Sequence, residues 1–156
     1  MRQKVDKIVE FALIATLAMM LLNVIWQVLS RYVLGVPSTI TDELSRYGLI
    51  WLGMLGGAYG TGKGLHLAID IFPNSLNDQK RKVLDNFINS LIFLFSAIVM
   101  IMGGLRLTYI TFSLGQTSSS LGIQLTFIYA MVPISGILIC YYSVHNIIQN
   151  STKKAT

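Results

Sequence analysis

Two histidines and one aspartate are the side chains in this sequence that could hold a metal ion or a haem. His66 and Asp70 are four residues apart, so on a helix they share a face and can form a hydrogen-bonded pair or half of a metal site. Pairing is favoured, because metal sites normally have three or four ligands. His66 and His145 together could be axial haem ligands, which is the alternative hypothesis for this chain. Our primary interpretation predicts no metal and no cofactor.

The motifs that carry enzyme chemistry are missing from the sequence. It contains no phosphate-binding loop, dinucleotide fingerprint, cysteine pair or nucleophile motif. Cys140 is the single cysteine, which excludes a disulfide framework. We therefore predict no catalytic residue and no enzymatic activity.

A group of charged residues precedes an apolar stretch. Asp42 and Glu43 lie four and three residues before Arg46, so on a helix either carboxylate can pair with the guanidinium. Both acids would occupy a first helical turn, where the positive end of the helix dipole favours negative charge. Lys63 closes the apolar stretch at its other end. The stretch is therefore bracketed by charges.

Between these charges the chain carries small residues at helical spacing beside a tryptophan: Trp51, Gly53, Gly56, Gly57 and Gly60. In a water-soluble helix each glycine would cost about 1 kcal/mol relative to alanine. In a bilayer, glycines at this spacing let a second helix approach closely. Gly53 and Gly57 would open one groove, and Gly56 and Gly60 a neighbouring one. We expect a helix-packing or partner-subunit interface here, with one groove filled by the chain's own spans and the other by a partner.

The elements that position these residues are predicted to be membrane helices. The chain has 156 residues, of which 53% are hydrophobic and only 12% charged, with a mean hydropathy of +0.62. A spanning helix needs about 20 predominantly apolar residues. The charge-free intervals predict an all-α integral membrane protein, one four-helix domain over 1–156, with short interfacial helical segments in its connections. The predicted spans are 8–32, 42–63, 84–111 and 123–148, the second reaching this length only with its charged flanks.

Polar residues and a proline inside the spans add local expectations. Asn23 and Gln27 are four residues apart and share a face, which predicts hydrogen bonds to another helix. Pro133 and Gly136 predict a kink in the last span. The N-terminal apolar run is too long for a signal peptide and has no small-residue cleavage site, so we expect a retained first helix.

The basic residues predict the orientation. The net charge of +5 does not form a nucleic-acid-binding patch, because the charges lie at span ends. Most Lys and Arg residues lie in the two termini and the 63–82 connection, which places these in the cytoplasm and Asp42, Glu43 and Arg46 at the outer face. The inner face would carry these groups, as plain topology signals or as a site for anionic lipid: Lys63, His66, Asp70, Lys80, Arg81 and Lys82.

The middles of the predicted spans contain no Asp, Glu, Lys or Arg. A carrier that moves a charged solute by itself needs such groups deep in the membrane. An autonomous small exporter, the third hypothesis, therefore has no coupling residue in this sequence.

Several short motifs together resemble the small membrane subunit of tripartite ATP-independent periplasmic (TRAP) transporters. They are RYVLG at 31–35, DELSRY at 42–47, WLG at 51–53, GGAY at 56–59 and KGLHLAID at 63–70. Ile40 and Lys63 depart from the family pattern, which has an aromatic residue and an arginine near these positions. A lysine at 63 weakens any bidentate contact there.

The resemblance implies a non-catalytic scaffold subunit in the bacterial inner membrane. Its implied partners are a large membrane transport subunit, a periplasmic substrate-binding protein that it helps to dock, and membrane lipids, but no nucleic acid. The complex would be a sodium-driven symporter for an organic acid of the C4-dicarboxylate or sialic acid type. Asp42, Glu43 and Arg46 would then belong to a periplasmic-side interface.

Overall fold

The computed structural model describes residues 2–64 and 78–152, and its regular elements in these ranges are all helices. The predicted all-α class is thereby confirmed for the described part of the chain. In chain order the elements are α1 (Arg2–Tyr32), α2 (Thr39–Lys63), α3 (Asp78–Phe95), the π-helix η2 (Ser96–Gly103), α4 (Gly104–Ser113), α5 (Leu125–Tyr129) and α6 (Met131–Thr152).

Three helical rods in the described residues are long and apolar enough to cross a membrane: Arg2–Tyr32, Lys82–Ser113 and Leu125–Asn150. The second of these joins α3, η2 and α4 without a break. Helix α2 has 25 residues, but its acids, its terminal lysine and its many glycines lower its hydropathy, and it does not meet the same test. The second predicted span, 42–63, therefore stays a prediction.

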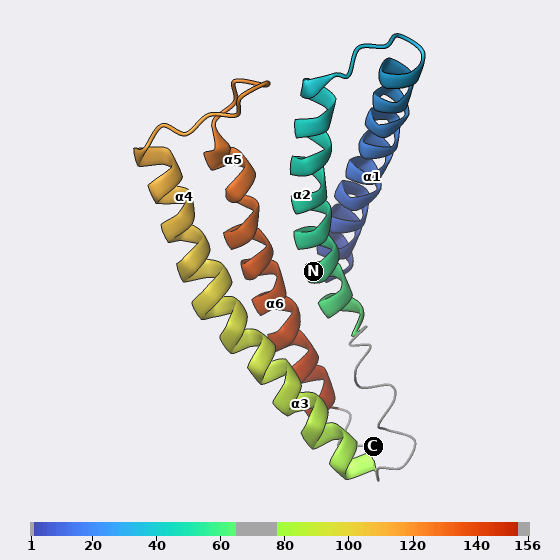
Figure 1. The fold of residues 1–156 in the computed structure, drawn as a ribbon. Helices are drawn as coiled ribbons and strands as arrows, with labels where there is room; N and C mark the ends of the chain where they lie inside the picture. Colours follow the sequence, from blue (N-terminus) through green and yellow to red (C-terminus); the bar gives the residue numbers. More distant parts are fainter. Residues whose placement is uncertain (1, 65–77, 153–156) are drawn as a thin grey trace.

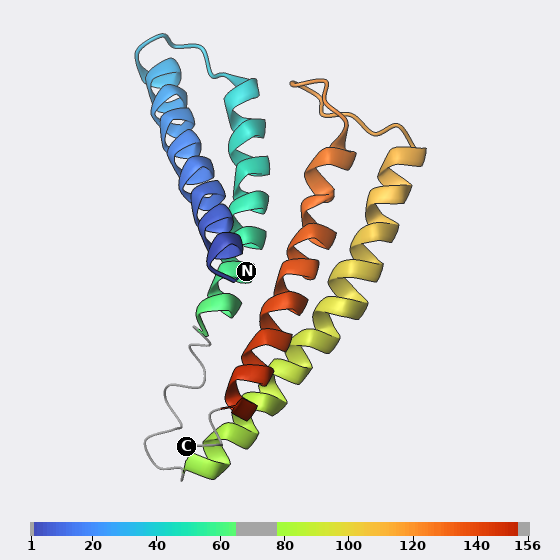
Figure 2. The ribbon, with the colours of Figure 1, turned by 180° about the vertical axis from the view of Figure 1, so that it is seen from behind.

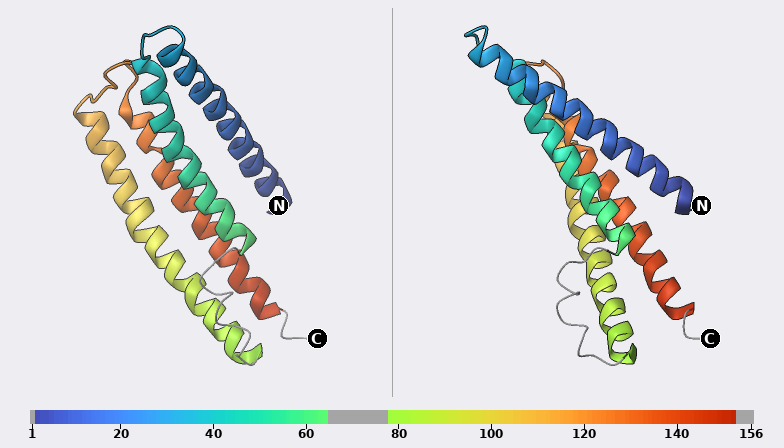
Figure 3. Two further views of the ribbon diagram at one scale, coloured as in Figure 1. Left: turned by 45° about the vertical axis from the view of Figure 1, so that its right-hand side comes forward. Right: turned by 90° about the vertical axis from the view of Figure 1, so that its right-hand side faces the viewer.

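The helices stand side by side in a row, in the order α1, α2, α6 and the α3–η2–α4 rod (Figures 1 and 2). Helix α6 packs against both α2 and the rod, whereas no extensive packing joins α1 to the rod in the described ranges. Seen from the side, α1 runs obliquely to the other helices (Figure 3). Both ends of the described chain lie at one end of the row, here called the terminal end. The connections 33–38 and 114–124 lie at the other, the loop end (Figure 1).

Four glycines for which the sequence predicted no packing role allow the helices of the row to touch. A Cβ added at Gly104 would lie 2.9 Å from Pro133 Cδ, and one at Gly136 would lie 2.8 Å from Met100 Cβ. Gly62 packs in the same way against the Tyr142 ring and Gly48 against Met20. These close approaches join α6 to the rod, α2 to α6, and α1 to α2.

The expectation of short interfacial helices is wrong for the connection 114–124. That segment consists of turns and one isolated bridge between Thr117 and Gln124. Gly115, just after the end of α4, and Gly122 adopt φ of +58° and +65°, in the left-handed region that favours glycine. The other connection, 65–77, lies outside the described residues.

The last rod is interrupted where the sequence predicts a kink. Helix α5 ends at Tyr129 and α6 begins at Met131, just before Pro133. Proline has no N–H to donate to the carbonyl four residues earlier, so the helical hydrogen-bond ladder breaks there. No feature of the sequence predicted η2.

Candidate functional site

Glu43 fastens the start of α2 to the 114–124 connection at the loop end. Its Oε2 accepts hydrogen bonds from the Ser118 hydroxyl, from the Ser120 amide at 3.1 Å and from the Leu121 amide at 3.3 Å. Three donors on one carboxylate oxygen suit the ionised form. We call this group of four residues the Glu43 clasp. It holds a connection more than 70 residues away in the sequence against α2.

Arg46 pairs with Asp42 and not with Glu43, the two partners that the spacing allowed. The Arg46 Nη2 to Asp42 Oδ2 distance is 3.0 Å, and both side chains are more than half exposed. Gln27 of α1 donates to Asp42 Oδ1 at 3.2 Å. Ser38 caps the helix by accepting from the Thr41 amide. An exposed pair of this kind contributes only about 0–1 kcal/mol.

Asn23 makes the interhelical hydrogen bonds predicted for it. Its side-chain amide donates to the Thr41 carbonyl at 2.7 Å and lies 2.6 Å from Ser45 Oγ. The side chain is buried between α1 and α2. It therefore fixes how these two helices pack near the loop end.

Replacing Glu43 with alanine is expected to release the 114–124 connection and to lower transport by the assembled complex. The three donors would lose their common acceptor, whereas Glu10→Ala removes an exposed carboxylate on α1 that makes no hydrogen bond or ion pair with a described residue, and it serves as the matched control. Thermal unfolding of the isolated subunit and uptake by the reconstituted complex measure the two effects. Equal unfolding temperatures and equal uptake rates for the two variants would show that the Glu43 clasp contributes neither to stability nor to transport.

The four glycines of the predicted interface form an open strip along α2. A Cβ added at Gly53, Gly56, Gly57 or Gly60 would meet no described atom within 4 Å. The expectation that the chain's own spans fill one of the two grooves is therefore wrong for the described residues. The reason is that α2 uses other positions, such as Leu55 and Ala58, to face its neighbours. We call these four residues the glycine strip.

Trp51 lies apart from the glycine strip. It lines an apolar cavity of about 300 Å³ between α1, α2 and the start of the last rod, together with residues such as Met20 and Phe127. Leu44 and Trp51 are seven positions apart, which is two helical turns, and Tyr47 and Gly48 between them also line the cavity. The strip and the tryptophan, grouped together from the sequence, thus belong to different faces of α2.

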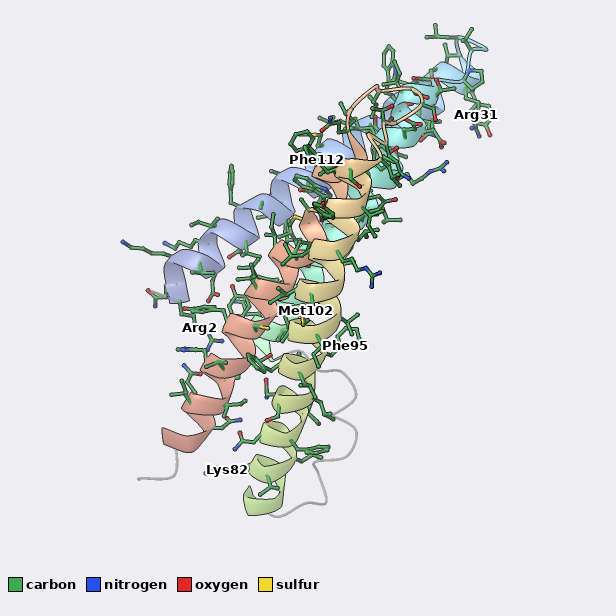
Figure 4. The ribbon with its side chains drawn as sticks, turned by 90° about the vertical axis from the view of Figure 1, so that its left-hand side faces the viewer. Arg2, Arg31, Lys82, Phe95, Met102 and Phe112 are labelled. Atoms are coloured by element: carbon green, nitrogen blue, oxygen red, sulfur yellow. The ribbon has the colours of Figure 1, made fainter. Side chains whose placement is uncertain are left out.

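The terminal end is held by a polar network that the sequence did not reveal. The Tyr142 hydroxyl donates to Asp6 Oδ1 at 2.8 Å, and Arg2 lies 3.9 Å from the same carboxylate. Arg2 also donates to the Gly62 carbonyl at the end of α2 (Figure 4 labels Arg2). Asn146 donates to the neighbouring Thr61 carbonyl at 3.0 Å. The Thr61 and Gly62 carbonyls in the last turn of α2 thereby accept hydrogen bonds from side chains of α6 and α1.

Among the predicted terminal-end residues, the structure describes the side chains of Lys63 and Lys82, and Lys63 contacts an aromatic ring. Its ammonium lies 5.2 Å from the centroid of the Tyr59 ring, within cation–π range. Gly64 ends α2 with a φ of +68°, a conformation that favours glycine. His66 and Asp70 lie outside the described residues. Of the 80–82 basic cluster, the helix backbone is described, and the Lys82 side chain is partly exposed.

His145, the described histidine of the haem hypothesis, has protein partners. Its Nε2 lies 3.1 Å from Gln149 Nε2, and its ring stacks on Tyr141 with a centroid distance of 6.3 Å. Within the described ranges no group of three His, Cys, Asp or Glu side chains could hold a metal ion. No described contact favours the haem hypothesis.

The residues missed from the sequence share one property: their partners are far away along the chain. Ser118 and Ser120 belong to an uncharged serine run, and Tyr142 belongs to an apolar span. The available signal was Asp6, one of two acids in the first three turns of α1, because a carboxylate at the end of a membrane helix needs a donor.

Comparison with known proteins gives one consistent result. The family described as "Tripartite ATP-independent periplasmic transporters, DctQ component" matches residues 8–153. A TRAP transporter small permease protein of Haemophilus influenzae is 30% identical over 99 residues, which cover 64% of this chain and 61% of the relative.

Two further relatives extend this result. The C4-dicarboxylate TRAP transporter small permease protein DctQ of Rhodobacter capsulatus is 25% identical over 107 residues, 69% of this chain and 47% of the relative. The sialic acid TRAP transporter permease protein SiaT of Haemophilus influenzae is 27% identical over 115 residues, 74% of this chain and 18% of the relative. The matched region spans less than two thirds of each of these relatives.

Proposed function

This chain belongs to the DctQ family of TRAP transporters, and we propose that it packs as a scaffold against a large transport subunit and helps to dock a periplasmic binding protein. As a DctQ component it is a transporter subunit, not an enzyme, and a multi-pass protein of the inner membrane. The proposed transport is sodium-driven and takes an organic acid. The relatives named for C4-dicarboxylate and for sialic acid support these two substrate types alike.

The match of the DctQ family to residues 8–153 is the observation that carries this proposal. The open glycine strip supports it from the structure. Lipid provides no hydrophobic drive for helix association, so small residues that allow close packing are typical of contact surfaces in membranes. A strip left unfilled by its own chain suits a partner helix. We therefore propose that Gly53, Gly56, Gly57 and Gly60 face the large subunit.

The two ends of the row carry the other proposed contacts. At the loop end Asp42, Glu43 and Arg46 lie together and line a polar pocket of about 330 Å³, which suits docking of a soluble protein. At the terminal end Lys63 and Lys82, with the rest of the basic cluster, suit contact with anionic lipid or with the large subunit.

The proposed orientation places both termini in the cytoplasm and the loop end in the periplasm. The basic residues concentrate at the terminal end and in the 63–82 connection, which is the cytoplasmic pattern. In a Cys140→Ala background, an impermeant maleimide is expected to label Ser119→Cys in intact spheroplasts, and Ser75→Cys only after permeabilisation. The reverse pattern of labelling would invert the topology.

Transport is expected to require the partners. Liposomes that contain only this chain should show no sodium-dependent uptake of an organic acid above protein-free background, because its spans lack a charged site at the membrane centre. Adding the large subunit and the binding protein should produce uptake. Uptake by the chain alone would contradict the scaffold role and favour an autonomous carrier.

A further inference from the structure

Arg106 carries an uncompensated positive charge inside one of the candidate spans. It lies in α4, within the rod Lys82–Ser113, and its side chain is exposed. Among the described residues it makes no hydrogen bond and no ion pair. The ion pairs among the described residues join Arg2 to Asp6 and Arg46 to Asp42, and both lie near helix ends.

The position of Arg106 is well inside the rod. It precedes the last residue of α4, Ser113, by seven residues, which is about 10 Å of helix. The segment from Leu107 to Phe112 that follows it is uncharged. Two residues before it, Gly104 packs on Pro133, which itself lies eight residues inside the neighbouring rod. Arg106 thus lies in the third of the rod nearest the loop end, about two helical turns before the end of α4.

The direction of α4 makes an escape to the loop-end surface difficult. Side chains on a helix lean toward the helix N-terminus. Because α4 runs toward the loop end, the Arg106 side chain starts out toward the membrane interior. Its exposed neighbours are apolar, among them Met102 and Tyr109 (Figure 4 labels Met102 and Phe112 on either side of this position). A charge in such surroundings is unfavourable unless it is paired.

A glycine beside Arg106 leaves room for the partner. Gly103 precedes Arg106 by three residues, so the two lie on one side of the helix. A Cβ added at Gly103 would meet no described atom within 4 Å. A helix backbone from outside the chain can therefore approach at this position and carry a side chain to the guanidinium.

We propose that Arg106 forms an intramembrane ion pair with an Asp or Glu side chain on a membrane helix of the large subunit. This inference rests on the proposed partnership and specifies its chemistry. Arginine suits the role because it stays charged and can bind a carboxylate with two parallel hydrogen bonds.

The test uses the co-expressed complex of this chain with its large subunit, purified through a tag on this chain. Arg106→Gln and Arg106→Glu should weaken the association on the order of 100-fold, because the carboxylate would be left buried without a partner. Arg106→Lys should retain most of it. The control is Lys7→Glu, which reverses an exposed basic residue on α1, outside the surfaces proposed as interfaces. Size-exclusion elution of each isolated variant separates lost pairing from misfolding.

A charge exchange completes the test. Replacing the partner acid with arginine should restore the association of Arg106→Glu, and screening each membrane Asp and Glu of the large subunit identifies it. Wild-type yield of the large subunit with Arg106→Gln and Arg106→Glu would overturn the ion pair while leaving the proposed function intact. Loss of bound phospholipid with full retention of the large subunit would overturn it in favour of a lipid phosphate. Failure of the wild-type chain to capture the large subunit would instead remove the proposed function itself.

Discussion

Replacing Gly57 with leucine is expected to leave the chain folded and to strip it of the large subunit. Gly57 is exposed, and an added side chain meets no described atom of its own chain, so the helix row should be unaffected. A leucine there would hold a partner helix away from the strip. Overpacking of a tight site typically costs about 1–3 kcal/mol, which weakens a complex about 5- to 150-fold. Gly60→Leu should behave in the same way.

The measurement is the yield of large subunit that co-purifies in detergent through a tag on this chain. Ala18→Leu is the matched control, because Ala18 is also a small, exposed residue on a span but lies on α1, outside the strip. Thermal unfolding of the isolated Gly57→Leu subunit should match that of the wild type. If both leucine variants retain the large subunit in full, the strip faces lipid.

Replacing Gly104 with leucine is expected to destabilise the isolated subunit itself, whether or not the large subunit is present. The first carbon of the new side chain would lie 2.9 Å from Pro133 Cδ and 3.0 Å from Pro133 N. The second contact is to backbone, which cannot turn aside as a flexible side chain can. The rod and α6 must separate, at a cost of about 1–3 kcal/mol or more.

Gly103→Leu provides the comparison for stability, because it makes the same change one residue earlier in open space. The thermal unfolding midpoint of the isolated subunit should fall in Gly104→Leu and stay near the wild-type value in Gly103→Leu. Identical midpoints in the two variants would show that α6 and the rod do not pack as closely as described.

The features of the fold that could be predicted from the sequence are those that depend on local composition. Long charge-free intervals indicated the apolar rods, Asn23 and Gln27 indicated the α1–α2 contact, and Pro133 indicated the break before α6. Each of these features depends on residues close together along the chain.

What the sequence did not predict depends on packing between distant segments. The chain contains 13 glycines, and spacing alone does not distinguish Gly104, which contacts Pro133, from Gly103, which contacts nothing described. The difference arises from the rotation of the rod about its axis, which is fixed by all its contacts with α6 together. The Glu43 clasp is another such case, because its partner Ser118 lies 75 residues away.

The arrangement of the helices in a row limits what this subunit can enclose. A conduction pathway needs a ring of helices around a lumen, and a row has two broad faces and two edges. Within the described chain, α1 and the α3–η2–α4 rod form those edges and do not close on one another. The described helices therefore form a flat layer and do not surround a channel. Any solute that crosses the membrane beside it must therefore travel along a passage that another protein completes.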